Sequence, residues 1–291
     1  MSGEFAFIQS LRALATHPAA RNLEDDCAVL EVGSETLILT HDMMMEGTHY
    51  LAGADMADVA WKLVACNLSD LAAKGAEPLG VLLGHMLGED DEAFASGLAE
   101  ALWHCNVPLL GGDTVGGTGT HSHGLTAIGR ATHSPVPSRS GTQIGDALYI
   151  TGQLGAAMIG YEALRDGLDA DHIAYTRPLP RLGEGQALAP HVTAMMDISD
   201  GLLLDAFRMA EASDVSIAID SASVPIDAPE NRRMDALTWG DDYELLFTLP
   251  AGIEPSVPVT RIGQVEPRGF APLFLDGEPL INAEGLGYSH N

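Results

Sequence analysis

The chain of 291 residues carries 41 acidic and 14 basic side chains, a formal net charge of −27. This charge argues against a nucleic-acid or anionic-membrane surface, because both partners are themselves densely negative. With 46% hydrophobic residues and no run near the roughly 20 apolar residues of a membrane helix, the sequence predicts a globular cytoplasmic protein. Three separated cysteines give neither a zinc motif nor a disulfide framework.

The first half of the chain alternates helical and strand-like patterns. Residues 55–75 show the clearest one, with Val59, Leu63 and Leu71 on one helical face before a glycine. In chain order the patterns predict a helix at 3–17, strands at 27–32 and 36–42, a helix at 55–75, a strand at 77–87, a helix at 89–105, and strands at 106–114 and 123–132.

A segment rich in Pro, Ser and Gly at 133–146 interrupts these patterns and marks a domain junction. Residues 147–167 then predict a strand, a glycine turn and a helix, and residues 193–220 repeat that order before a further strand. Later strands are expected at 241–250, 257–266 and 271–277. We therefore expect two α/β domains, residues 1–135 and 136–291.

Aspartates recur where apolar segments meet loops. Helix capping explains any one of them, and for each aspartate taken singly a structural role is the favoured interpretation. Together they favour a multi-metal site, because clustered carboxylates repel unless cations lie among them, and Mg²⁺ prefers oxygen ligands. The set comprises Asp25, Asp26, Asp42, Asp70, Asp113, Asp197, Asp200, Asp241 and Asp242.

Magnesium held this way usually binds together with substrate phosphates. The chain has no G-x-x-x-x-G-K-[ST] loop, since Lys74 precedes its glycine with no Ser or Thr after it, and no G-x-G-x-x-G after a strand. Nucleotide phosphates would therefore be neutralised mainly by metal ions, with one arginine such as Arg130 or Arg139.

Seven motifs occur in an order that resembles the thiamine-monophosphate kinases, whose superfamily includes aminoimidazole ribonucleotide synthetase and selenophosphate synthetase. They are DDCAV, TLILTHDMMMEGTHY, NLSDLAAKGAEP, LLGGDT, RSGTQIGDALYITG, MDISDGL and WGDDYELLF. The resemblance implies a two-domain aminoimidazole-ribonucleotide-synthetase-like fold, with an N-terminal mixed sheet and helices and a C-terminal α/β domain. It also implies a homodimer joined through the N-terminal sheets.

The implied reaction is ATP-dependent phosphorylation of thiamine monophosphate to thiamine diphosphate, by direct phosphoryl transfer with several Mg²⁺ ions between the domains. Such transfer needs little covalent chemistry from the protein, because positioning and charge neutralisation carry it. The resemblance assigns metal binding to Asp26, Thr40, His41, Asp42, Asp70, Asp113, Asp197 and Asp200, and it centres catalysis on Asp70, Asp113 and Asp200. It assigns the ATP contacts to Gly112, Asp113, Arg139 and Ser199. It assigns the thiamine monophosphate contacts to His49 and Asp241.

Four positions depart from the family pattern. Glu24 replaces a glycine before the paired aspartates, and His41 replaces a threonine, which is harmless if that residue acts through its backbone carbonyl. Asp241 replaces a longer glutamate at the thiamine contact. Gly285 stands where an aromatic residue would stack on thiamine, and Tyr288 is the alternative.

Two other functions stay open on the sequence. One is a different ATP-dependent synthetase or kinase of the same superfamily. The other is a non-catalytic, acidic protein that binds divalent cations, which predicts metal binding that does not depend on nucleotide.

Overall fold

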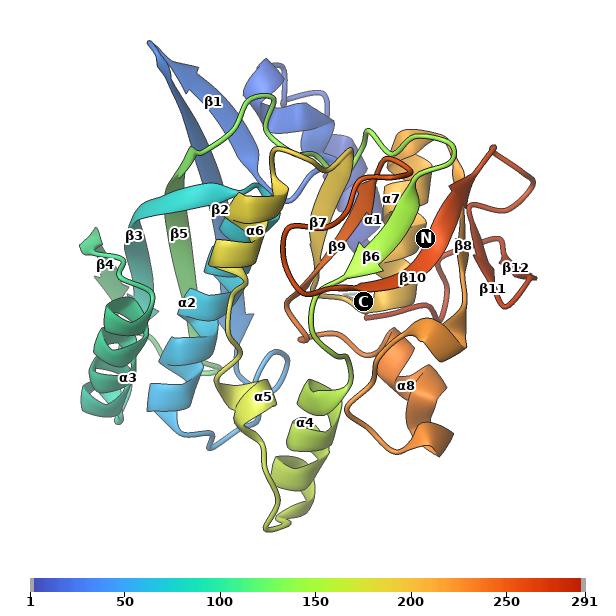
Figure 1. Ribbon diagram of the computed structural model, residues 1–291. Helices are drawn as coiled ribbons and strands as arrows, with labels where there is room; N and C mark the ends of the chain where they lie inside the picture. The colour runs from blue at the N-terminus through green and yellow to red at the C-terminus, as the bar shows by residue number, and fades with distance from the viewer. Residues whose placement is uncertain (1–2, 289–291) are drawn as a thin grey trace.

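The computed structural model describes residues 3–288 and contains two mixed β-sheets, one from each half of the chain (Figure 1). The first sheet has the strand order β1-β2-β5-β3-β4, and its neighbours run antiparallel except for the parallel pair β3 and β4. Its strands are β1 (Ala28–Val32), β2 (Glu35–Met45), β3 (Ala76–Met86), β4 (Leu109–Val115) and β5 (Ser122–Ala131).

Helix α2 (Met56–Ala73) packs on one face of the first sheet, with α3 (Asp91–His104) beside it. The side chain of Asp55 caps α2 by accepting a hydrogen bond from Ala57 N at 2.8 Å. Apolar residues of both helices meet alternate residues of β2 and β5, such as Ile38 and Leu125, in one core. We call this side of the sheet its inner face.

The opposite side, the outer face, exposes large apolar side chains. Met43 on β2 is 57% exposed and Leu82 on β3 is 39% exposed. Leu110 and Val115 on the edge strand β4 are exposed as well. Exposed apolar residues gathered in this way are typical of a surface that contacts another protein.

The second sheet has the order β12-β11-β8-β10-β6-β9-β7. Helix α7 (Leu202–Ser213) packs on one of its faces over the largest apolar core. The strands are β6 (Ala147–Ile150), β7 (Ala194–Ile198), β8 (Ser216–Ile219), β9 (Glu244–Leu249), β10 (Thr260–Glu266), β11 (Leu273–Leu275) and β12 (Glu278–Leu280). The other α-helices of this half are α4 (Ala156–Asp166), α5 (Ile173–Thr176), α6 (Leu182–Leu188) and α8 (Arg233–Thr238), and two short 3₁₀ helices lie at Ser221–Ser223 and Glu230–Arg232.

Helix α2 also contacts the second sheet, so it lies between the two sheets (Figure 1). Ala72 and Ala73 near its C-terminus pack with Met195 of β7 and with Leu245 and Phe247 of β9. Small side chains at the helix end allow this close approach. One helix therefore fixes the segment before β1 and the end of β7 in the same region.

The fold prediction is confirmed, with differences in the short elements. The expected helix at 3–17 is shorter: α1 (Gly3–Leu11) ends early, and a 3₁₀ helix follows at Pro18–Leu23. Leu14 is 77% exposed, so its helical spacing has no surface to pack against. Helices α5, α6 and α8 were not predicted, because each has too few residues to establish a helical period.

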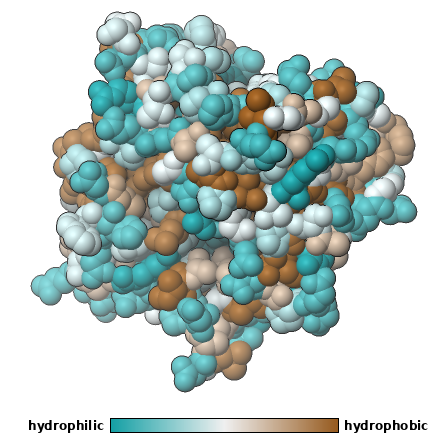
Figure 2. Space-filling model, viewed as in Figure 1, coloured by the Kyte–Doolittle hydropathy of each residue, from teal (hydrophilic) through white to brown (hydrophobic). Residues whose placement is uncertain are grey.

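Figure 2 shows hydrophilic residues spread over the visible face, with smaller hydrophobic areas between them. The high net charge fits such a surface. Between residues 3 and 288, no helix combines the length and the apolar character needed to cross a bilayer.

Candidate active site

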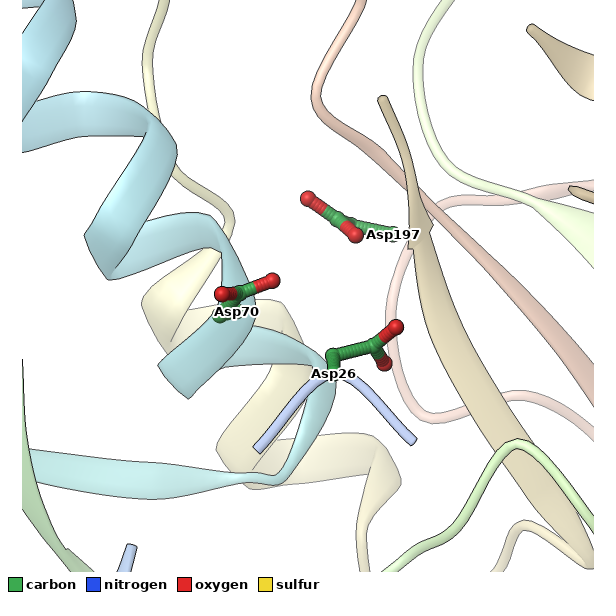
Figure 3. A group of neighbouring side chains, drawn as sticks. All are labelled: Asp26, Asp70 and Asp197. Carbon is green, nitrogen blue, oxygen red and sulfur yellow. The ribbon is translucent and has the colours of Figure 1, made fainter. Parts of the chain in front are cut away.

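Three aspartates from both halves of the chain meet beside α2, and they form the aspartate cluster (Figure 3). Asp26 precedes β1, Asp70 lies near the end of α2, and Asp197 lies in β7. One carboxylate oxygen from each lies within 4.8 Å of the others. Oxygen donors at this spacing fit a hard divalent cation such as Mg²⁺.

Local structure directs these side chains toward one another. Met196 and Ile198 of β7 face the core under α7, so strand alternation turns Asp197 toward α2. There Ser69 Oγ donates a hydrogen bond to Asp197 Oδ2 at 2.7 Å. On the other side of α2, the Thr40 hydroxyl of β2 donates to the carboxylate of Asp70.

Burial and mutual repulsion favour the protonated forms of these carboxyl groups. Burial raises the pKa of Asp70 well above its usual value, and the charges of Asp42 and Asp197 add to the shift. The pKa of Asp197 rises for the same main reason, with a contribution from Asp26. Burial raises the pKa of Asp42 to about 6. A cation would stabilise the ionised forms, so this group of side chains is suited to exchange protons for metal.

Asp26 differs, because two cations reach it. Burial favours its protonated form, but Lys74 and Arg139 outweigh burial and lower the pKa. Lys74 Nζ lies 2.7 Å from Asp26 Oδ2, and the Arg139 guanidinium donates to the other oxygen. Lys74 also pairs with Asp25, which in turn binds Arg21. The sequence pattern around Lys74 bears only on a phosphate loop, so this role of Lys74 was not predicted.

Asp200 follows β7 in the turn before α7, and its charge adds to the burial that raises the pKa of Asp42. Its carboxylate accepts from Arg208 of α7, and its N–H donates to Asp205 Oδ2 at 3.1 Å. Asp205 is fully buried, which raises its pKa to about 7. Asp205 and Arg208 were not among the expected site residues. Their spacing of three on the helix after MDISDGL is the signal that could have indicated them.

Strand register separates two of the expected metal residues from the cluster. Across β2, β5, β3 and β4, one row joins Asp42 to Gly112, and the next row joins Met43 to Asp113. Met43 is on the outer face, so Asp113 belongs to that face, and β4 is exposed along its length. The His41 side chain is also on the outer face, where its Nδ1 lies 2.8 Å from Thr126 Oγ1. Within one chain neither side chain joins the aspartate cluster.

Gly112 has a structural reason to be glycine. A Cβ atom there would lie 2.0 Å from the carbonyl oxygen of Leu83. No larger residue fits this position of β4 without moving the strands apart. Packing alone therefore explains the glycine at position 112.

The two residues expected at thiamine monophosphate, His49 and Asp241, lie near each other around Lys62 of α2. Lys62 Nζ donates to Asp241 Oδ2 at 2.8 Å and to the carbonyl oxygen of His49 at 3.4 Å. The Asp241 N–H donates to the carbonyl oxygen of Ser199 at 2.9 Å. Lys62 was not among the expected site residues, and its position inside an apolar helical run is the signal for it.

The departure Glu24 and the alternative aromatic residue Tyr288 have clear positions. Glu24 pairs with Arg12 at 2.6 Å and does not join the aspartate cluster. Tyr288 lies beside Asp200, because its N–H donates to the Asp200 carbonyl oxygen at 2.9 Å. Gly287 permits this approach, since a Cβ there would lie 2.4 Å from that same oxygen. The C-terminal segment therefore borders the site.

The fold and this site fit two known domain families. The AIR synthase related protein N-terminal domain matches residues 24–131, and the AIR synthase related protein C-terminal domain matches residues 143–269. The chain is therefore a two-domain protein of the AIR synthase related class.

Individual proteins that resemble this chain over most of its length show which family within this class it belongs to. The chain is 36% identical to thiamine-monophosphate kinase of Escherichia coli K12, over 91% of this chain and 90% of the relative. It is 33% identical to that of Haemophilus influenzae, over 99% and 98%. AaThiL, solved in complex with AMPPCP and TMP, is 29% identical with a TM-score of 0.85, over 96% of this chain and 95% of that one. The chain belongs to the thiamine-monophosphate kinase family.

Proposed function

We propose that this protein transfers the γ-phosphoryl group of ATP to thiamine monophosphate, forming thiamine diphosphate and ADP. A terminal phosphate oxygen of thiamine monophosphate forms a bond to the γ-phosphorus, and the bond from that phosphorus to the β,γ-bridging oxygen breaks. The aspartate cluster carries the proposal, because it supplies what phosphoryl transfer between two polyanions needs from a protein.

The donor set fits magnesium, since carboxylate and hydroxyl oxygens gather there. Bound Mg²⁺ would neutralise charge on the transferring phosphoryl group. Asp26, Asp42, Asp70, Asp197 and Asp200 would hold the ions, with Thr40 orienting Asp70. His41 would contribute through its backbone carbonyl, because its side chain is on the outer face.

We assign the substrate contacts to residues from both halves of the chain. We assign ATP phosphates to Arg139 and Ser199, and thiamine monophosphate to His49 and Asp241. Arg139 already lies at Asp26, so it would move from a carboxylate to a phosphate when nucleotide binds. Tyr288 beside Asp200 is the aromatic residue we assign to thiamine.

We further propose that the protein is a cytoplasmic homodimer joined through the outer faces of the first sheets. The exposed apolar residues of that face support this arrangement, as does the position of Asp113 on the same face, away from the aspartate cluster of its own chain. Asp113 would then serve the site of the second copy. The two units would divide at residues 135 and 136, inside the segment that joins the sheets.

The test is direct. Purified protein is incubated with ATP, Mg²⁺ and thiamine monophosphate, and thiamine diphosphate and ADP should appear in equal amounts. ATP binding without thiamine diphosphate would favour another synthetase or kinase of the superfamily. Divalent cation binding without nucleotide binding would leave a non-catalytic metal-binding protein.

A further inference from the structure

The chain has only two lysines, Lys62 and Lys74, and both are buried. Lysine is usually exposed, because burying an ammonium is unfavourable unless partners compensate its charge. Asp25 and Asp26 explain Lys74. Lys62 lies nearer the start of α2 and needs a separate explanation.

Lys62 joins three segments that are distant in sequence. Its ammonium donates to Asp241 and to the His49 carbonyl oxygen, and it lies 3.8 Å from the centroid of the Tyr175 ring. Tyr175 also donates from its hydroxyl to the His49 carbonyl oxygen at 3.4 Å. Ion pair, carbonyl and aromatic face together compensate the buried charge.

Asp241 is held from several sides. One carboxylate oxygen accepts from Lys62, and the other accepts from the Tyr243 hydroxyl at 2.9 Å. Its backbone has a φ of +65° and is tied to Ser199. The side chain is still 29% exposed, so a ligand can reach the carboxylate.

Stability is a weak reason for this arrangement, because apolar residues often replace a buried ion pair at little cost. Orientation is a stronger reason. Thiamine monophosphate carries a thiazolium cation and an aminopyrimidine, and a carboxylate that receives such a ligand has to be fixed before the ligand arrives.

We propose that Lys62 is a positioning residue for thiamine monophosphate. It holds the Asp241 carboxylate and the His49 loop in the arrangement that receives the substrate, and it acts through them. This inference rests on the proposed function and adds a residue to the substrate side of that site.

Steady-state kinetics of Lys62→Met test the role. We expect the KM for thiamine monophosphate to rise roughly tenfold or more, while the KM for ATP changes less than about twofold. Lys62→Arg should recover part of the loss, because it restores the charge with a different geometry. Asp241→Asn should raise the same KM, and the double variant should add little to it, because both changes break one interaction.

Arg177→Met is the matched control. Arg177 pairs with Asp58 of α2 and so links the same helix to the segment after α5. Its ion-pair partners are Asp58 and Glu100, and neither is one of the residues assigned to the substrate. Its loss should lower thermal stability slightly and leave both KM values unchanged.

Unchanged KM for thiamine monophosphate in Lys62→Met would overturn the proposal. So would a parallel rise of both KM values with a lower melting temperature, which is the mark of a purely structural role. If Lys62→Met does not fold, Lys62→Gln decides by the same two KM values. A wild-type protein that forms no thiamine diphosphate overturns the proposed function instead, and this is measured before any variant is compared.

Discussion

The inner and outer faces of the first sheet use neighbouring residues for different purposes. Along β2, Thr40 and Asp42 turn inward toward α2, whereas His41 and Met43 turn outward. The inward residues are largely buried among carboxylates, and the outward ones are exposed. A step of one residue along a strand changes the face. Neighbours within a sequence motif therefore need not share a site.

The largest effect is expected on the inner side. Asp70→Asn should reduce turnover about 1,000-fold or more, because it removes charge from the centre of the proposed magnesium site. The metal-free variant should melt at the wild-type temperature or above it, since a buried carboxylate disappears. Activity assays and thermal melts measure both. Turnover within tenfold of the wild type would contradict the metal assignment.

A mixing experiment tests whether the outer face serves a second copy. Asp113→Asn and Asp70→Asn should each be inactive alone. Co-expressed in equal amounts, they should recover about a quarter of wild-type activity, because half of the dimers are mixed and each mixed dimer has one intact site.

This recovery distinguishes the two arrangements of Asp113. If Asp113 served its own chain, both sites of every mixed dimer would lack a residue. No recovery in dimers confirmed by light scattering would therefore contradict the shared site.

The inner carboxyl groups also predict a pH dependence. The raised pKa values of Asp42, Asp70 and Asp197 mean that the folded protein holds more protons than the unfolded chain above about pH 4. Stability of the metal-free protein should therefore fall as the pH rises through about 6. Mg²⁺ at the proposed site would replace the protons, so it should raise the melting temperature by several degrees more at about pH 7.5 than at about pH 5.5. Equal shifts at both pH values would argue against a metal-for-proton exchange.

The smallest effect is expected for His41→Ala. Its side chain bonds to Thr126 on the outer face, so the substitution should change kcat and the Mg²⁺ requirement less than about threefold. Thr40→Ala, one residue earlier, is the comparison. It should lower the apparent affinity for Mg²⁺ about tenfold or more, because Thr40 orients Asp70. A larger loss from His41→Ala than from Thr40→Ala would reverse the assignment of the two faces.

The long elements and the aspartate cluster were predictable from the sequence, for physical reasons. The apolar period of α2 and the strand that ends at Asp197 are strong local patterns, and the order of motifs implied that Asp26, Asp70 and Asp197 belong together. In the structure, one carboxylate oxygen from each of these three residues lies within 4.8 Å of the others, and their binding of metal stays a prediction. The face on which His41 and Asp113 lie depends on strand register, which no local pattern fixes. The ion pairs of Lys62 and Lys74 join segments far apart in the chain, so only the fold brings them together.

The burial of both lysines gives the protein a built-in chemical reporter. An amine-reactive reagent finds no surface lysine on this chain, and it can modify Lys62 or Lys74 only when α2 separates from the groups around it. Mass spectrometry can distinguish the two, because fragment ions place the added mass on residue 62 or on residue 74 of the sequence. The rate of modification at each position thus measures how often each end of this interface opens.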